Sequence, residues 1–235
     1  MNIGIRLSMT LFIMAILTLS ILSCKQENIQ SAQKTETVDT LKTVPILPIP
    51  QDENKDRDVW QKPSIVIDLL GDLSSKTVAD IGAGTGYFTF RFALKAEKVI
   101  AIDIENRFLE IINTFKRNLP SDVAGRIETR LAKPNDPLLE KEEVDLIVII
   151  NTIGEIQYRK AYLRTLLPGL KKGGQLVILD YKMKNLPIEN APPQNDRVPL
   201  NVIEKELDES GYVNVVSNDT SLDYQYIVFA SRALD

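Results

Sequence analysis

A run of three glycines after an apolar segment is the feature of this chain whose residue types and spacing best suit ligand chemistry. Residues 77–81 predict a buried strand, and Gly82, Gly84 and Gly86 follow at alternate positions before an apolar helix. A strand that turns directly into a helix gathers backbone N–H groups at the positive end of the helix dipole. Because glycine permits close approach and positive φ, the turn predicts a site for an anionic or polar ligand.

An acidic residue at the tip of the next strand is the second such feature. Residues 98–102 predict that strand, and Asp103 follows it directly. An acid at this place in a strand–helix–strand unit can accept two hydrogen bonds from a ribose diol. A dinucleotide fingerprint would require its third glycine where Tyr87 stands. The spacing therefore disfavours a nicotinamide-dependent oxidoreductase, which is one alternative interpretation of the glycine run.

Residues 80–86 read Asp-x-Gly-x-Gly-x-Gly, and with Asp103 they resemble the first two motifs of class I S-adenosylmethionine-dependent methyltransferases. The resemblance extends over about residues 58–231. It implies an α/β fold, namely a doubly wound, Rossmann-like, seven-stranded and mostly parallel sheet with a reversed C-terminal hairpin strand. It also implies S-adenosyl-L-methionine as cofactor, with the turn around its methionine part and the acid on its ribose. The cofactor contacts it implies are Trp60, Asp80, Gly82, Gly84, Gly86, Tyr87, Asp103, Ile104, Asp136 and Asn151.

Two of these contacts have an ordinary structural alternative. Trp60 precedes the first strand, in a segment that folds over the cofactor in many relatives, but it can equally be a core residue. Asp136 follows the predicted third strand, where the family often places an acid on the adenine amino group. Between Asn135 and Pro137 it can equally be a turn residue. An α/β domain whose glycine turn holds no ligand is the corresponding alternative for the motif as a whole.

The candidate catalytic residues follow the fourth and fifth predicted strands. Several small bacterial relatives carry an aromatic–histidine pair after the fourth strand, where this chain has Ile153-Gly154-Glu155. Methyl transfer mainly requires positioning, and a general base is needed only when the nucleophile arrives protonated. Glu155 is the first candidate for that base and Tyr181 the second. The alternatives are a solvated or helix-capping acid for Glu155 and simple packing for Tyr181.

The composition removes several other kinds of site. The chain has no histidine, and its single cysteine, Cys24, lies outside the predicted domain, so imidazole catalysis, histidine or thiolate metal sites and disulfides within the fold are excluded. No acidic spacing specifies a hard-cation site. The net charge of −4 argues against a nucleic-acid partner. We therefore predict neither a metal nor a nucleic acid as partner.

The N-terminus predicts export. Arg6 precedes an apolar run over residues 9–22, and Ile21-Leu22-Ser23-Cys24 resembles a bacterial lipobox. We expect residues 1–23 to be a lipoprotein signal peptide and Cys24 to carry the lipid, with an uncleaved anchor as the alternative. Residues 24–57 predict a disordered tether and residues 58–235 the methyltransferase-like domain. The resulting expectation is a membrane-anchored lipoprotein on the periplasmic side or outer membrane of a Gram-negative bacterium.

Three functions remain open at this point, the third being the nicotinamide-dependent oxidoreductase that the glycine spacing disfavours. The first is an active methyltransferase with a small-molecule acceptor. The second is an exported, degenerate member of the family that binds a ligand or partner without catalysis. The replaced fourth motif and the scarcity of cofactor outside the cytosol motivate the second. The other expected elements are a helix within 58–72 that has Pro63 near its first turn, helices at 105–118, 158–170 and 199–210, strands at 126–131, 144–150, 175–180, 212–216 and 225–230, a glycine stop at 171–174 and a substrate-side loop at 182–198.

Overall fold

The computed structural model describes residues 56–188 and 191–234. The predicted signal peptide, the lipidated Cys24 and nearly all of the predicted tether lie outside these residues and stay predictions. Within the described ranges, no helix has the length and apolar character needed to cross a lipid bilayer.

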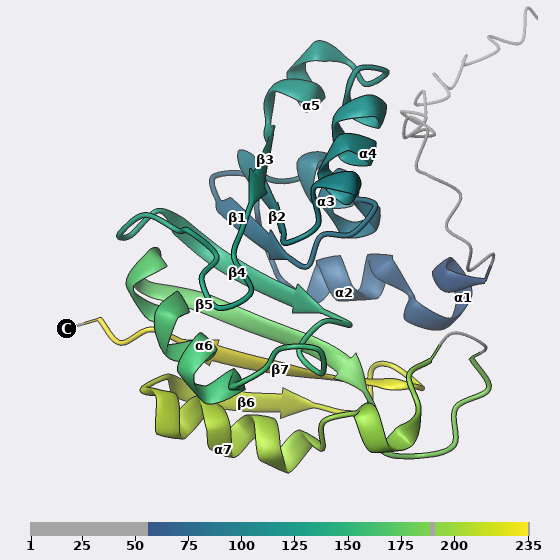
Figure 1. The fold of residues 1–235 in the computed structure, drawn as a ribbon, viewed down its shortest axis with the longest axis vertical. Coiled ribbons are helices and arrows are strands. Elements are labelled where there is room, and N and C mark those ends of the chain that lie inside the picture. Colours follow the sequence, from purple (N-terminus) through teal and green to yellow (C-terminus); the bar gives the residue numbers. More distant parts are fainter. Residues whose placement is uncertain (1–55, 189–190, 235) are drawn as a thin grey trace, which may run out of the picture. The chain divides into compact units, whose positions relative to one another are not determined.

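Seven strands form one sheet in the order β3-β2-β1-β4-β5-β7-β6 (Figure 1). The neighbouring strands from β3 to β5 are parallel, and β7 runs antiparallel to β5 and β6. This confirms the predicted doubly wound sheet with its reversed C-terminal hairpin strand. The strands are β1 Thr77–Ile81, β2 Lys98–Asp103, β3 Ile127–Leu131, β4 Val144–Ile150, β5 Leu170–Tyr181, β6 Val213–Asn218 and β7 Gln225–Ser231.

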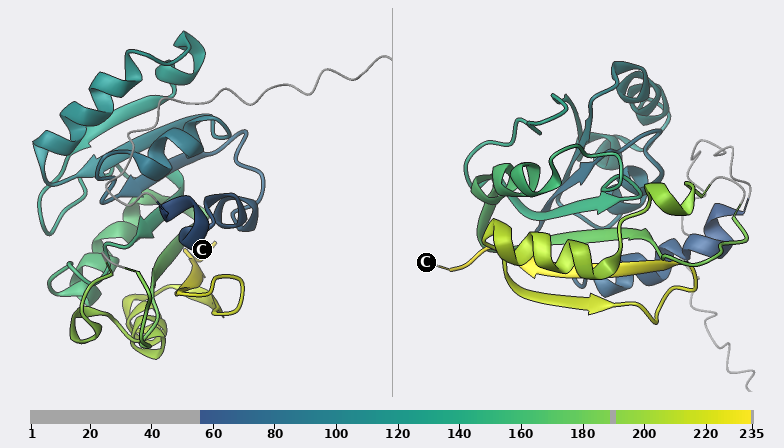
Figure 2. Two further views of the ribbon diagram at one scale, coloured as in Figure 1. Left: turned by 90° about the vertical axis from the view of Figure 1, so that its right-hand side faces the viewer. Right: turned by 60° about the horizontal axis from the view of Figure 1, so that its bottom comes forward.

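Helices cover both faces of the sheet (Figure 2). Successive strand residues point to opposite faces, so Val78 belongs to one core and Ala79 to the other. The core of Val78 includes side chains of α2 to α5, and that of Ala79 includes side chains of α6 and α7. Burial on both faces explains why β4 is an almost continuous apolar run. The helices are α1 Arg57–Gln61, α2 Pro63–Leu69, α3 Tyr87–Ala93, α4 Asn106–Lys116, α5 Ser121–Gly125, α6 Arg159–Leu166 and α7 Leu200–Ser210, with 3-10 turns η1 Leu167–Gly169 and η2 Gln194–Asp196.

The helix expected within 58–72, with Pro63 in its first turn, is confirmed as α2, and a short helix that was not predicted, α1, precedes it and ends where Lys62 adopts φ 49°. Two local predictions were wrong. The helix expected to reach Leu170 ends at Leu166, and Pro168 lies in the 3-10 turn that follows. The glycine stop at 171–174 is part of β5, beside a register shift in its pairing with β4. The short helix α5 was not predicted.

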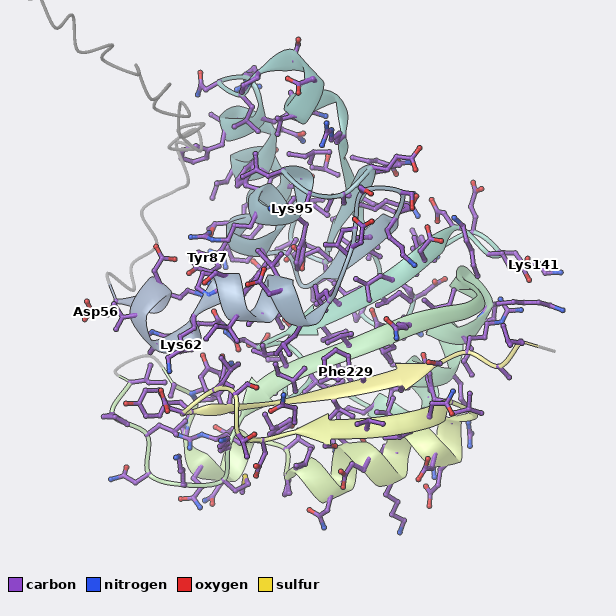
Figure 3. The ribbon with its side chains drawn as sticks, turned by 180° about the vertical axis from the view of Figure 1, so that it is seen from behind. Asp56, Lys62, Tyr87, Lys95, Lys141 and Phe229 are labelled. Carbon is purple, nitrogen blue, oxygen red and sulfur yellow. The ribbon has the colours of Figure 1, made fainter. Side chains whose placement is uncertain are left out.

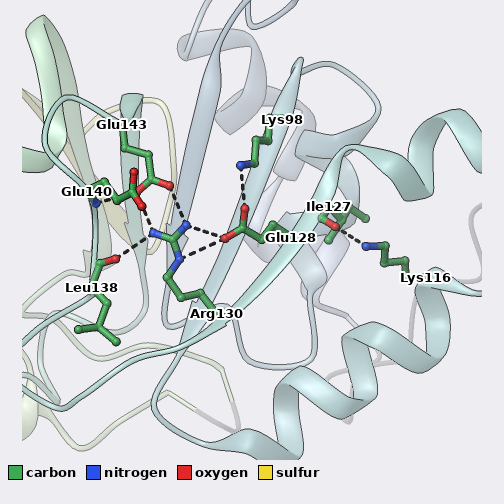
Figure 4. A network of polar contacts seen from close by, with 8 residues as sticks. All are labelled: Lys98, Lys116, Ile127, Glu128, Arg130, Leu138, Glu140 and Glu143. Carbon is green, nitrogen blue, oxygen red and sulfur yellow. Dashed lines mark hydrogen bonds and ion pairs between the residues drawn. The ribbon is translucent and has the colours of Figure 1, made fainter.

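An arginine on β3 holds the loop between β3 and β4 (Figure 4). The Arg130 guanidinium donates to the carboxylate of Glu143 at 2.7 and 2.8 Å, to Glu128 at 2.6 Å and to the carbonyl of Leu138 at 3.0 Å. Glu143 also accepts the Glu140 N–H at 2.8 Å. Arg130 and Glu143, which bond to each other, lie at the two ends of the loop and also bond to Leu138 and Glu140 within it, so this network fixes the course of the loop.

Replacing Arg130 by methionine should lower the free energy of unfolding by about 1–3 kcal/mol at neutral pH, since the Glu143 charge loses its partner in a largely buried place. Hydrogen bonds from Arg130 hold the pKa of Glu143 below its ordinary value of 4.5. A carboxyl with a lowered pKa stabilises the fold above its unfolded pKa and loses that contribution as the pH falls through its folded pKa. The difference between wild type and variant should therefore shrink below a pH of 4.5.

Urea unfolding at several pH values measures this difference. The matched control is Arg117→Met, because Arg117 is exposed and bonds only to a threonine hydroxyl among the interactions of the described residues. An equal decrease in the free energy of unfolding in both variants would contradict the role given to Arg130.

Candidate functional site

A cavity of about 750 Å³ opens at the carboxyl ends of β1, β2 and β4. The strand order reverses between β1 and β4, which is where open α/β sheets bind their ligands. The volume suits a ligand of nucleoside size or somewhat larger. The cavity walls come from the glycine turn, the end of β2, the loop after β3 and the loop after β4, with further residues from helices, namely Arg57 of α1, Phe108 of α4 and Tyr162 of α6.

The glycines of the turn have two different tasks. Gly82, Gly84 and Gly86 all have positive φ, at 72°, 53° and 88°. A Cβ on Gly82 would lie 2.3 Å from the Thr152 hydroxyl oxygen, so glycine there lets the turn pack against the loop after β4. A Cβ on Gly84 would meet no atom within 4 Å, and this glycine lines the cavity. Gly86 instead faces the core, where a Cβ would lie 2.7 Å from the Phe90 ring.

Asp103 joins the turn to the end of β2. Its carboxylate accepts the Gly84 N–H at 2.8 Å through Oδ2 and the Glu105 N–H at 2.9 Å through Oδ1. A carboxylate has about four acceptor positions, so each oxygen can accept one more hydrogen bond from a ligand hydroxyl. Asp103 and the half-exposed Ile104 both line the cavity. The end of β2 therefore offers an acid and an apolar surface side by side.

Asp80 lies beneath the turn rather than on the cavity wall. It is buried, and its Oδ2 accepts the Thr89 hydroxyl at 2.6 Å. Burial raises the pKa of Asp80 to about 6, and the bond from Thr89 opposes that rise. The contact links β1 to α3 directly. Asp80 thus positions the turn, and the structure does not place it against a ligand.

Four other predicted contacts also lie off the cavity wall. The rings of Trp60 and Tyr181 are 5.9 Å apart and pack with Leu186. Tyr87 lies against α1, with the Arg57 guanidinium 4.0 Å from its ring (Figure 3). Asp136 accepts the N–H of the residue two positions later, at 2.8 Å, as a turn residue does. These positions agree with the structural alternatives for Trp60, Tyr181 and Asp136.

Six of the predicted residues come together on the cavity wall, namely Gly82, Gly84, Asp103, Ile104, Asn151 and Glu155. Sequence reasoning missed Arg57, Phe108 and Tyr162, which also line it. Phe108 and Tyr162 have the apolar spacing of core residues on their helices, which gave no signal of a site. The described residues contain no group of three His, Cys, Asp or Glu that could hold a metal ion.

The loop after β4 places Glu155 on the cavity wall, and a second carboxyl, that of Asp180, lies nearby at the end of β5. Glu155 is exposed on the wall, whereas Asp180, at the end of β5, is buried. Burial raises the pKa of Asp180 to about 6, and the charge of Glu155 adds to that rise. Asp180 Oδ1 accepts the Tyr181 N–H at 2.6 Å. Of the two carboxyls, only Glu155 is placed to meet a ligand.

Comparisons with known proteins agree with this architecture. A family model described as a methyltransferase domain matches residues 72–224, which is more than half of the chain. The ubiquinone/menaquinone biosynthesis C-methyltransferase UbiE of Ectopseudomonas mendocina is 26% identical over 133 residues. That match covers 55% of this chain and 50% of the relative, so the chain matches about half the length of this relative.

Two solved structures share the fold. A S-adenosylmethionine-dependent methyltransferase from Aquifex aeolicus has a TM-score of 0.67 and 22% identity, covering 76% of this chain and 93% of that one. The cyclase SpnF has a TM-score of 0.63 and 15% identity, covering 74% and 82%. At these identities the likeness shows the fold alone. On the match over residues 72–224, the chain belongs to the methyltransferase domain family, as the glycine motif and Asp103 predict.

Proposed function

We propose that this protein is an enzyme that transfers a methyl group from S-adenosylmethionine to a small-molecule acceptor. The observation that carries the proposal is the position of Asp103 and the glycine turn on one cavity, at the strand-order reversal of a methyltransferase-family chain. The named relative from Ectopseudomonas mendocina is a C-methyltransferase. Since the match spans half of that relative, its name supports methyl transfer here without fixing the acceptor.

The residues on the cavity wall fit this cofactor. Asp103 can accept the hydroxyls of a ribose, and Ile104 with Phe108 provides an apolar surface for a base. Arg57 and the backbone of the glycine turn suit a carboxylate. When bound, the cofactor supplies a methyl group activated by a positively charged sulfur. The protein's own task is therefore to hold an acceptor in line and to remove its proton where it has one.

We assign the removal of the acceptor's proton to Glu155. It is exposed and lines the cavity from the loop that follows β4. No histidine is present in the chain to take this role. The competing function is binding without catalysis. Its support is also the sequence after β4, where Glu155 stands in place of the aromatic–histidine pair of several relatives.

We also propose that the domain is exported and anchored by a lipid on Cys24. The support is the sequence of residues 1–24, a positive start, an apolar run and a lipobox-like end. Lipid anchoring by several acyl chains would hold the protein stably at a membrane, whereas one chain binds only marginally.

Replacing Asp103 by alanine should weaken the binding of S-adenosylhomocysteine at least about tenfold, because hydrogen bonds to a charged group contribute about 1.5–3 kcal/mol each. Isothermal titration calorimetry measures the affinity. The matched control is Asp145→Ala. Asp145 also accepts a backbone N–H, from Thr77 at 2.9 Å, but it does not line the cavity. Equal affinity in wild type and in the Asp103 variant would exclude the cofactor assignment.

Replacing Glu155 by glutamine should slow methyl transfer by about 100-fold or more to an acceptor that arrives protonated, while the affinity for S-adenosylhomocysteine stays unchanged. The release of S-adenosylhomocysteine is followed with hydroxyl, thiol and amine acceptors. Glu140→Gln, an exposed glutamate away from the cavity, is the control. If wild type binds the cofactor but methylates none of these acceptors, the binding-only function gains the support instead.

Replacing Cys24 by serine should abolish incorporation of labelled palmitate and move the protein from the membrane fraction to the soluble fraction, because serine cannot form the thioether. Ser20→Ala, which lies before residues 21–24, is the control. A Cys24 variant that stays in the membrane fraction would favour the uncleaved anchor.

A further inference from the structure

Three side-chain amides meet where β4 ends at the cavity. Gln61 comes from α1, Asn151 directly follows β4, and Gln225 begins β7. Gln61 and Gln225 are 0% exposed. The Gln61 amide donates to Gln225 Oε1 at 3.0 Å and to Asn151 Oδ1 at 3.3 Å, and Gln225 Nε2 also donates to Asn151 Oδ1. These buried groups can be satisfied only as a set, so the orientation of one amide determines the others.

An arginine fixes that orientation. Arg57 Nε donates to Gln61 Oε1 at 2.6 Å. Since a guanidinium has no acceptor, the atom of Gln61 that faces it must be the oxygen. The Gln61 nitrogen is then the donor to Gln225 Oε1 and to Asn151 Oδ1. Gln225 consequently turns its own nitrogen toward Asn151. The direction of every hydrogen bond in the set follows from one group that can only donate.

The consequence for Asn151 is that its oxygen accepts two hydrogen bonds and its NH2 group makes none with the described residues. Among those residues, the one buried polar side-chain atom without a partner is Asp180 Oδ2, so the Asn151 nitrogen is not sealed in the core. Asn151 lines the cavity and is held at φ 57°, in the left-handed region that asparagine tolerates. Asn151 thus combines an NH2 group that is not sealed in the core with a place on the cavity wall.

We propose that Asn151 donates a hydrogen bond from this NH2 group to an oxygen of the methyl acceptor, and that it selects phenols or enols over amines. The proposal rests on the proposed function and specifies its substrate class. A phenolate or enolate oxygen accepts from the amide, whereas the N–H groups of a neutral amine would face another donor. The acceptor's hydroxyl proton passes to Glu155. An electron pair of the oxygen, or of a carbon conjugated with it, forms the new bond to the methyl carbon, and the electrons of the broken carbon–sulfur bond stay on sulfur.

Two probes of the same shape test the selection. The full-length protein is saturated with S-adenosylhomocysteine and titrated with 4-nitrophenol, at a pH where the phenol is ionised, and with 4-nitroaniline. We expect wild type to bind the phenolate at least about tenfold more tightly, since a hydrogen bond to a charged group is worth about 1.5–3 kcal/mol. Asn151→Asp keeps the shape and the tolerance for positive φ but replaces the NH2 group by an oxygen, so this preference should disappear.

The matched control is Asn113→Asp. Asn113 is similarly half-buried, bonds to Thr129 at 3.1 Å and lies away from the cavity, so its variant should keep the preference. An unchanged urea unfolding midpoint in the Asn151 variant shows that the fold has survived. Equal binding of the two probes by wild type, or a preference that persists in the Asn151 variant, would overturn this inference alone. A wild type that binds no S-adenosylhomocysteine would overturn the proposed function and this inference with it.

Discussion

The carboxylate of Asp103 provides the contact on which the cavity depends. A glycine turn has many accessible conformations, and holding it open over a cavity requires a partner outside the turn. Asp103 supplies that partner by accepting the Gly84 N–H while its second oxygen accepts the Glu105 N–H. One charged group thereby bonds to both the glycine turn and the loop after β2, two segments that line the cavity. It keeps acceptor capacity for the ligand only because both of its present partners are single N–H donors.

The buried amides impose a second constraint, on the N-terminal segment. Helix α1 has five residues and would not be stable alone. It is held because leaving Gln61 or Gln225 unpaired in the core would cost about 1–3 kcal/mol for each buried group. The same bonds place Arg57 on the cavity wall, where it also contacts the Tyr87 ring. Trp60 packs on Tyr181 on the other side of this segment. The segment before the first strand is thus part of the cavity wall through Arg57, which bonds to Gln61, and not through Trp60.

The sequence predicted the parts of the site that a local pattern encodes. Gly82, Gly84 and Asp103 are recognisable because a strand, a turn and a helix follow one another within a short stretch. The amide set is not recognisable in this way, since Gln61 and Gln225 are 164 positions apart and polar residues have no helical or strand period. Asp80 and Asp136 carry the right residue type, but burial and turn geometry, which only the folded chain shows, direct them elsewhere. The start of α2 at Pro63 was predictable because proline suits the first helical turn, whereas the early end of α6 and the 3-10 turn at Pro168 were not predicted.

The fold leaves the reaction open, since it is shared by a methyltransferase and by the cyclase SpnF. The loop after β4 contributes several polar residues to the cavity wall. Its first residue, Asn151, is oriented by groups that lie outside the loop, and its acid, Glu155, is exposed to the cavity. In the roles proposed for them, Glu155 takes the proton from an acceptor hydroxyl and Asn151 donates a hydrogen bond to the oxygen that then carries the negative charge. A neutral amine forms no oxyanion for the Asn151 donor to stabilise and would present its own N–H groups to that donor. The chemistry of this loop therefore depends on the rigidity of the amides behind it as much as on the residues that face the cavity.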